Sequence, residues 1–269
     1  MLTNDFLGDN VARLGFGAMR LPVIDSDASN IDQVTLDAMV DMAIKAGVNY
    51  FDTACPYHGG MSEIALGRSL ARYPRDSYFF ATKYPGHQIS DTYDPAAIFE
   101  KQLIKCGAEY FDFYLLHNIC EASIEVYLDE QWGIADYFVE QKKNGRIRHL
   151  GFSCHGRPET LKRFLDYGAR KYAELEQRDP ETAALFAGNN IMEFCQIQLN
   201  YLDWTLQDAA AKTALLESMN IPIVVMEPLR GGKLAHLNDA QMQQLNASAS
   251  DGANPSACSA VEWSFRWLL

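Results

Sequence analysis

The feature that most constrains how this chain can fold is the regular spacing of its short apolar segments. Residues that end successive segments, from Asp52 to Lys83 and on to His117, lie 31 and 34 residues apart. The segments are rich in β-branched and aromatic residues, which is typical of strands buried on both faces. We expect strands at residues 14–19, 48–53, 77–83, 111–117, 147–153, 193–200 and 221–228.

Helical segments separate these strands. We expect helices at residues 32–46, 61–72, 96–106, 136–144, 158–167 and 205–219, where apolar residues recur at helical spacing. Alternation of strand and helix at this period is typical of βαβ units and predicts an α/β protein with a parallel sheet. An open doubly wound sheet and a closed barrel both fit this alternation.

Three segments depart from the alternation. The opening residues predict a hairpin that turns at Gly8, Asp9 and Asn10. The polar stretch at 170–190 indicates an additional surface helix and loop rather than a new domain, and residues 256–269 have the pattern of an amphipathic helix. Because no linker rich in Pro, Gly or Ser divides the chain, we expect residues 1–269 to form a single domain.

The composition argues against several kinds of partner. Of the 269 residues, 48% are hydrophobic, which is enough for one large core, and the formal net charge is −12. An acidic chain is a poor match for a nucleic-acid backbone, and no apolar run approaches the ~18 residues of a membrane helix. The chain opens without a secretory signal, and its six cysteines form no CxxC pair. We therefore expect a cytoplasmic protein with free thiols, no metal, and no nucleic-acid or membrane partner.

Four polar residues stand at or just after the ends of neighbouring strands. Asp52 and Lys83 each end a strand, Tyr57 lies in the loop after Asp52, and His117 ends the following strand. Taken singly, each has an ordinary explanation as a strand-end, packing, solvated or core residue. In a (β/α) barrel the carboxyl ends of the strands meet at one face, so the four side chains can converge on one pocket.

Reduction of a carbonyl group needs such a set of side chains. Hydride that arrives at the carbon leaves charge on the oxygen, which must then receive a proton. Tyr57 is the expected proton donor, and the ammonium group of Lys83 is expected to lower the pKa of the phenol from about 10 toward working pH. Asp52 would anchor Lys83, and His117 would donate a hydrogen bond that orients the carbonyl oxygen.

At these positions the chain resembles the aldo-keto reductases. The matching stretches run in the family's order through most of the chain, and include LGFGAMRLP, YFDTACPYHGGMSEIALGRSL, FFATKYP, YFDFYLLHNI, GRIRHLGFSCHG, CQIQLNYLD and IPIVVMEPLRGGKLA. The resemblance implies a (β/α)8 TIM barrel rather than an open sheet. It also implies an oxidoreductase that transfers hydride from NADPH to a small aldehyde or ketone, with Tyr57 as the proton donor.

The resemblance also implies which residues hold the cofactor. Ser153, Cys154 and Gln196 match positions that hold the nicotinamide carboxamide. The family usually has asparagine at Cys154, for which His155 is an alternative, and Gln198 is an alternative inward residue to Gln196. Met226 stands near where many members place an aromatic ring against the nicotinamide. The full set of expected cofactor contacts is Gly17, Ala18, Met19, Asp52, Ser153, Cys154, Gln196, Met226, Pro228, Leu229, Arg230, Gly231, Gly232 and Lys233.

Seven strands can be counted where the family's barrel has eight. We therefore expect a barrel truncated before its eighth strand, and because relatives grip the adenosine 2′-phosphate in that region, NADH stays open beside NADPH. The stretches LGFGAMRLP and CQIQLNYLD resemble the subgroup with a C-terminal ferredoxin-like extension, which we expect to be absent here. Two other functions stay open: a nicotinamide-binding sensor with little turnover, indicated by Cys154 and Met226, and an inactive, unclosed barrel. The sequence selects no oligomeric state.

Overall fold

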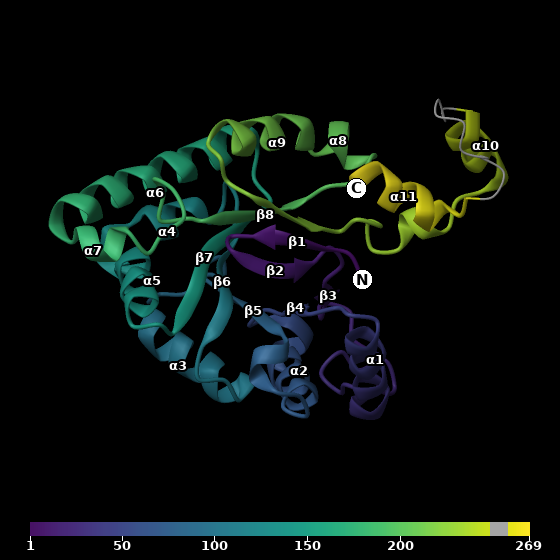
Figure 1. The fold of residues 1–269 in the computed structure, drawn as a ribbon, viewed down its shortest axis with the longest axis horizontal. Helices are drawn as coiled ribbons and strands as arrows, with labels where there is room; N and C mark the ends of the chain where they lie inside the picture. Colours follow the sequence, from purple (N-terminus) through teal and green to yellow (C-terminus); the bar gives the residue numbers. More distant parts are fainter. Residues whose placement is uncertain (248–257) are drawn as a thin grey trace.

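A curled parallel sheet of seven strands forms the centre of the molecule (Figure 1). The computed structural model describes residues 1–247 and 258–269. Each strand pairs in parallel with the next strand along the chain. The strands are β3 (Phe16–Gly17), β4 (Tyr50–Asp52), β5 (Phe79–Tyr84), β6 (Phe111–Ile119), β7 (Ile147–Cys154), β8 (Phe194–Gln198) and β9 (Ile223–Met226). All seven overlap their expected ranges, and the α/β alternation is confirmed.

Helices lie around the outside of the curled sheet, from α1 to α9 (Figure 1). The α-helices are α1 (Gln33–Lys45), α2 (Ser62–Leu70), α3 (Pro95–Cys106), α4 (Ile124–Leu128), α5 (Ile134–Lys143), α6 (Pro158–Arg178), α7 (Pro180–Ala183), α8 (Asp203–Leu206), α9 (Ala209–Ser218), α10 (Asp239–Ala247) and α11 (Ala260–Leu268). Short 3-10 turns are η1 (Tyr57–Gly60), η2 (Arg75–Ser77), η3 (Glu130–Trp132) and η4 (Lys233–Ala235).

Capping residues set the ends of the helices that flank the site. The Asp32 carboxylate accepts a hydrogen bond from the backbone amide of Thr35 at the start of α1. Asp94 caps α3 in the same way, and Pro95 occupies the first turn of that helix. α3 ends at Gly107, whose φ of 60° is the left-handed conformation that glycine adopts without strain.

The polar stretch at 170–190 differs from its expected form. We expected a helix ending near residue 167 and then a separate surface helix, but α6 continues to Arg178 and only the short α7 follows. Tyr167, Lys171 and Leu175 are buried at successive four-residue intervals along one face of α6. Burial of that face extends the helix, although charged residues on its other faces hide the periodicity in the sequence.

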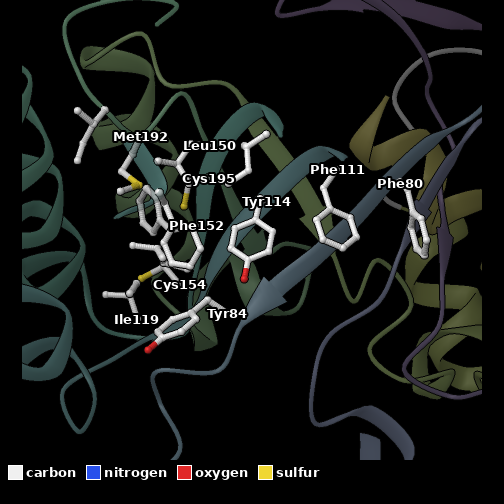
Figure 2. Packing of buried hydrophobic residues seen from close by; sticks show 14 of the residues in the cluster. Phe80, Tyr84, Phe111, Tyr114, Ile119, Leu150, Phe152, Cys154, Met192 and Cys195 are labelled. Atoms are coloured by element: carbon white, nitrogen blue, oxygen red, sulfur yellow. The ribbon is translucent and has the colours of Figure 1, made fainter. Parts of the chain in front are cut away.

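The two faces of the sheet carry separate apolar clusters. On the outer face, side chains such as Tyr114 and Phe152 pack toward the helices (Figure 2). Inside the curl, Tyr50, Phe113 and Phe194 fill the space near the amino-terminal half of the strands. Side chains alternate between the two faces along each strand, which separates the clusters. Because the inner cluster occupies the amino-terminal half of the strands, polar side chains can occupy their carboxyl ends.

A two-stranded hairpin opens the chain, and its turn differs from the expected one. β1 (Thr3–Phe6) and β2 (Asp9–Ala12) pair antiparallel, with Phe6 opposite Asp9. The turn therefore consists of Leu7 and Gly8, with φ of 58° and 89°, rather than residues 8–10. A two-residue hairpin turn of this hand needs left-handed backbone at both positions, which suits Gly8.

The hairpin covers the amino-terminal end of the sheet's interior. The ring of Phe6 lies 5.9 Å from the ring of Phe113 and 6.0 Å from that of Phe194. The Asp9 carboxylate lies 2.9 Å from His149 Nε2, at the start of β7. Strand pair and sheet together close one end of the interior, so any large opening lies at the other end or along the side.

The side between the outermost strands β3 and β9 is bridged by no further strand within the described residues. α11 lies beside this gap, near both termini in Figure 1, and Phe265 and Leu268 line the space within. α11 is the amphipathic helix expected for 256–269, of which residues 256 and 257 lie outside the described part. All six cysteines are free thiols. No helix in the described ranges is long and apolar enough to cross a membrane.

Candidate active site

The ends of β4, β5 and β6 bring the four expected catalytic residues together. Asp52 is the last residue of β4, Lys83 precedes the last residue of β5, and His117 lies near the end of β6. Tyr57 begins η1, the turn that follows β4. Neighbouring strands lie ~4.8 Å apart, so side chains on one face at their ends come within contact distance.

Lys83 is the buried centre of this group, with 1% of its side chain exposed. Its Nζ donates to Asp52 Oδ1 at 2.6 Å and to the carbonyl oxygen of Thr53 at 2.8 Å. Burial opposes the charge on Lys83, but Asp52 and Tyr57 outweigh it, so the pKa of Lys83 lies above its ordinary value. Lys83 therefore stays a cation at neutral pH.

Tyr57 lies between Lys83 and His117. Lys83 Nζ is 5.1 Å from the centre of the Tyr57 ring, and the His117 ring meets that ring edge-on at 5.8 Å. Burial raises the pKa of Tyr57, Lys83 lowers it and Asp52 raises it, with a net increase. We expected Lys83 to lower this pKa toward working pH; it acts in that direction, but burial is the larger influence. Tyr57 is therefore a protonated phenol at neutral pH.

His117 is a neutral imidazole in this site. Only 7% of the residue is exposed, and burial, with Lys83, His87 and His155 nearby, lowers its pKa from 6.5 to about 2. Its backbone carbonyl accepts a 2.6 Å hydrogen bond from the hydroxyl of Tyr127, which holds the end of β6 in place. A neutral imidazole can donate a hydrogen bond without a change of charge.

A cavity of about 1000 Å³ opens in front of these side chains. It reaches from the strand ends down to the hairpin, beside the gap between β3 and β9. Asp52, Tyr57 and His117 line it, whereas Lys83 lies behind them. Its other lining residues at the strand ends include Gly17, Met19, Arg20, Pro56, His87, Asn118, His155, Gln196, Gln198, Met226, Glu227 and Pro228.

The donors and acceptors beside Asp52 fit a primary carboxamide. Gln196 is 5% exposed, lines the cavity, and donates to Asp52 Oδ2 at 3.4 Å. Ser153, the register partner of Gln196, is 1% exposed and is not among the residues that line the cavity. Its Oγ accepts from the backbone amide of Asn118 at 2.8 Å, which leaves its hydroxyl hydrogen for another acceptor. An amide oxygen and a hydroxyl donor together match the two halves of a carboxamide.

Not every expected cofactor residue faces the cavity. Gly17, Met19, Met226 and Pro228 line it beside Gln196. Ala18 is fully buried, and its carbonyl oxygen accepts from the Ser62 hydroxyl at 2.9 Å. Ala18 thus lies outside the cavity lining, although its neighbours Gly17 and Met19 belong to it.

Cys154 lies on the other face of β7. Its side chain is buried in the outer apolar cluster, near Ile119 and Phe152 (Figure 2). Side chains alternate along a strand, so Ser153 and Cys154 point to opposite faces. The next residue, His155, lines the cavity instead. Of the two alternatives for the position where the family usually has asparagine, the geometry thus favours His155.

The glycine-rich turn after β9 lies beyond the cavity wall. Arg230, Gly231 and Gly232 all have positive φ, of 47°, 64° and 90°. Arg230 Nε lies 3.5 Å from the buried carboxylate of Asp203. Arg230 thus already has a protein counter-ion. The cavity lining stops at Pro228 in this loop, and Leu229 and Lys233 are outside it.

Several cavity residues were not anticipated from the sequence. His87 meets the His117 ring edge-on at 4.5 Å, and Arg20 pairs with Glu227 at 2.6 Å. Asn118 lines the cavity with a φ of 59°. Each lies within four residues of an expected site residue, and this proximity is the only sign in the sequence that it could reach the cavity. The spacing of residues does not show in which direction a loop runs, so these contacts could not be predicted.

The curled parallel sheet, with a buried Lys–Asp pair, a tyrosine and a histidine at the strand ends, defines a (β/α)-barrel oxidoreductase architecture. This chain belongs to the aldo/keto reductase family, whose family model matches residues 13–269. The expected family and fold are thereby confirmed.

Curated relatives support the family over part of their own length. A probable aldo-keto reductase 1 from Glycine max is 27% identical over 164 residues, covering 58% of this chain and 45% of that protein. The uncharacterized oxidoreductase YqkF of Bacillus subtilis is 30% identical over 166 residues, covering 58% and 49%. L-galactose dehydrogenase from Arabidopsis thaliana is 26% identical over 233 residues, covering 84% and 64%. The matches thus span about half to two thirds of these relatives.

Solved structures share the fold. The aldo-keto reductase AKR11C1 from Bacillus halodurans, in its holo form, superposes with a TM-score of 0.67 at 21% identity, covering 97% of this chain and 78% of that one. An aldo-keto reductase from Klebsiella pneumoniae in complex with NADPH gives 0.65 at 17% identity, covering 98% and 80%.

Proposed function

We propose that this chain is a carbonyl reductase that transfers hydride from NADPH to an aldehyde or ketone, with Tyr57 as the proton donor. The observation that carries the proposal is the convergence of Tyr57, the buried Lys83–Asp52 pair and the neutral His117 on one cavity. Residues 1–269 would form one oxidoreductase domain. The free cysteines suit a reducing, cytoplasmic setting.

Each residue has a separate task. The substrate oxygen would lie in front of Tyr57, where the imidazole of His117 donates a hydrogen bond to it. As the carbonyl carbon gains hydride, the oxygen takes the proton of the Tyr57 hydroxyl, and the resulting phenolate lies beside the Lys83 cation. Asp52 keeps Lys83 charged and in place at 2.6 Å. Solvent then returns a proton to Tyr57.

The bound nicotinamide would supply the hydride. Gln196, with Ser153 beside it on β7, would hold its carboxamide, and the thioether of Met226 and the backbone at Gly17 would lie against the ring. The backbone of residues 228–233 would cover the pyrophosphate. The Klebsiella pneumoniae relative is described in complex with NADPH, whereas an Escherichia coli relative is described as an NADH-specific methylglyoxal reductase. Both cofactors therefore belong in the test, with NADPH expected to bind more tightly.

The decisive variant is Tyr57→Phe, which keeps the ring that packs against His117 and removes only the hydroxyl. Loss of a positioned general acid typically slows a reaction about 100- to 10,000-fold. We expect that loss in turnover of a panel of aldehydes, with an unchanged NADPH-induced shift in melting temperature. Tyr137→Phe, in the outer layer on α5, is the matched control and should retain full turnover. Full turnover by Tyr57→Phe would exclude the proposed donor.

A second candidate is a nicotinamide-binding sensor with little turnover. The outward position of Cys154 favours it, because the cavity then offers the imidazole of His155 where the family usually has the amide of an asparagine. Tight NADPH binding, with wild-type turnover no higher than that of Tyr57→Phe on every substrate, would support the sensor. Ordinary turnover would remove it.

A further inference from the structure

Behind the catalytic lysine lies a buried carboxylate that the proposed reaction does not use. Glu63, in the first turn of α2, is 0% exposed. Its Oε1 accepts from Thr82 Oγ1 at 2.7 Å and from Gln102 Nε2 at 2.6 Å. Its Oε2 accepts from Lys105 Nζ at 2.7 Å. Both carboxylate oxygens of Glu63 are thus hydrogen-bonded to residues of α3 or β5.

Gln102 carries this network to the catalytic strand. The same side-chain nitrogen that bonds Glu63 also donates to the backbone carbonyl of Lys83 at 3.0 Å. The side-chain oxygen of Gln102 accepts from the Tyr114 hydroxyl at 2.5 Å. Gln102 is 1% exposed, so water does not compete for these bonds. The backbone of Lys83 is therefore held by a hydrogen bond from α3, on the outer face of the sheet.

The residue before Glu63 ties the same helix to the other strands. The Ser62 hydroxyl donates to the carbonyl of Ala18 at 2.9 Å and lies 2.8 Å from Thr53 Oγ1. The carbonyl of Thr53 in turn accepts from Lys83 Nζ. Because η1 with Tyr57 runs directly into α2, the start of this helix joins the turn of the tyrosine to the strand of the lysine.

We propose that Glu63 and Gln102 are positioning residues, which fix the backbone of Lys83 relative to Tyr57 through directed hydrogen bonds. The proposal rests on the proposed function, in which that spacing matters. A buried ion pair contributes less stability than apolar residues of similar volume commonly would, but its bonds have direction. A fully satisfied buried network holds its members in one arrangement.

The chain offers a matched control for this idea. Glu193, 1% exposed, pairs with Lys142 at 2.9 Å and accepts from the backbone amide of Leu150 at 2.8 Å. It has the same chemistry as Glu63, but it precedes β8 and therefore lies at the opposite end of the sheet. Glu63→Gln and Glu193→Gln each remove one buried charge, and only Glu63 is linked through Gln102 to the backbone of Lys83.

The main readout is the titration of Tyr57, followed by the ¹³Cζ signal of labelled tyrosine and assigned with Tyr57→Phe. If Glu63→Gln lets Lys83 move away, the phenol loses the cation that lowers its pKa, so the midpoint should rise. Direct loss of the Glu63 charge would lower it instead. Glu193→Gln should leave it unchanged. A midpoint that is unchanged or lower in Glu63→Gln would overturn the proposal, and this reading does not need turnover.

Kinetics supply a second reading. Misplacement of catalytic groups by about 1 Å can cost about 100-fold in rate, so we expect Glu63→Gln to lower kcat about 10- to 100-fold with little change in KM. Glu193→Gln should lose stability but not kcat. Equal losses of kcat in both variants would mean that Glu63 is merely structural. Absence of turnover in the wild type would instead reject the proposed function, while the titration still decides the positioning role.

A milder variant covers the case in which Glu63→Gln does not fold. Gln102→Met keeps an unbranched side chain of similar volume and leaves the pair between Glu63 and Lys105. It removes the direct hydrogen bond to the carbonyl of Lys83. The same upward shift in the Tyr57 midpoint is expected, and its absence in a folded Gln102→Met protein would contradict the proposal.

Discussion

The guanidinium of Arg20 lies 2.6 Å from the carboxylate of Glu227, across the gap between the two outermost strands of the sheet. Arg20 follows β3, and Glu227 comes directly after β9 with a left-handed φ of 58°. Both residues line the cavity. The ion pair therefore links β3 and β9, the outermost strands of the sheet, at the end where the proposed catalytic residues lie.

Removal of this link should loosen the edge strands more than it destabilises the fold. The Arg20 side chain is 59% exposed, and exposed ion pairs contribute about 1 kcal/mol or less. We expect Arg20→Met to change the free energy of unfolding by no more than that, and to speed amide hydrogen exchange in β9. Arg163→Met, which breaks an exposed pair with Glu125 on the outer helices, is the control. Equal exchange in β9 for the two variants would contradict the link.

The buried pair at the centre of the site should carry a much larger stability cost. Asp52→Asn leaves the Lys83 ammonium group, 1% exposed, without a counter-ion. Breaking a buried pair costs about 3 to 5 kcal/mol, and we expect a loss near the lower end because Asp52 borders the cavity. Chemical denaturation measures it. Asp41→Asn, in an exposed pair with Arg72, should stay within about 1 kcal/mol of wild type. Similar values for both variants would show that Lys83 is solvated.

His117 should make the fold sensitive to mild acid. Its pKa is lowered from 6.5 to about 2, so the unfolded chain takes up a proton before the folded chain does. The stabilisation is therefore complete above pH 6.5 and is lost as the pH falls below it. The loss from this residue reaches about 2 kcal/mol between pH 6.5 and pH 5. Denaturant unfolding at several pH values measures how the free energy of unfolding depends on pH. This dependence should be weaker in His117→Gln than in the control His236→Gln, because His236 is exposed.

Two glycines of the sheet should differ sharply in their tolerance of alanine. A Cβ at Gly151 would lie 2.5 Å from the Phe194 ring and 2.6 Å from its carbonyl oxygen. A Cβ at Gly17 would have nothing within 4 Å. Overpacking costs about 1 to 3 kcal/mol, so Gly151→Ala should lower the melting temperature while Gly17→Ala keeps it. If Gly17 borders the nicotinamide, Gly17→Ala should weaken the NADPH-induced shift instead.

The strands and the four catalytic candidates could be anticipated because they share one signal. Apolar segments mark the strands, and a polar residue at the end of such a segment is conspicuous. Asp52, Lys83 and His117 are all of this kind. Parallel strands bring their ends together whatever the details of the loops, so the convergence did not depend on exact boundaries.

The other features of the site depend on side-chain orientations and long-range contacts, which the spacing of residues in the sequence does not encode. Cys154 follows Ser153 directly, yet the two point to opposite faces of β7. Glu63 and Gln102 are 39 residues apart and meet only because α2 packs against α3. The net rise in the pKa of Tyr57 reflects how deeply the cavity wall buries it, which depends on the whole site.

The hairpin at the start of the chain has a consequence for the order of assembly. Phe6 packs against Phe113 and Phe194, and Asp9 contacts His149, so the hairpin finds these partners only after the strands as far as β8 have been made. Until then the amino-terminal end of the sheet's interior is not covered by the hairpin. Contacts between such distant parts of a chain form slowly. Docking of the hairpin therefore requires β6, β7 and β8 to be in place, and a probe attached to the hairpin should report on a late step of folding.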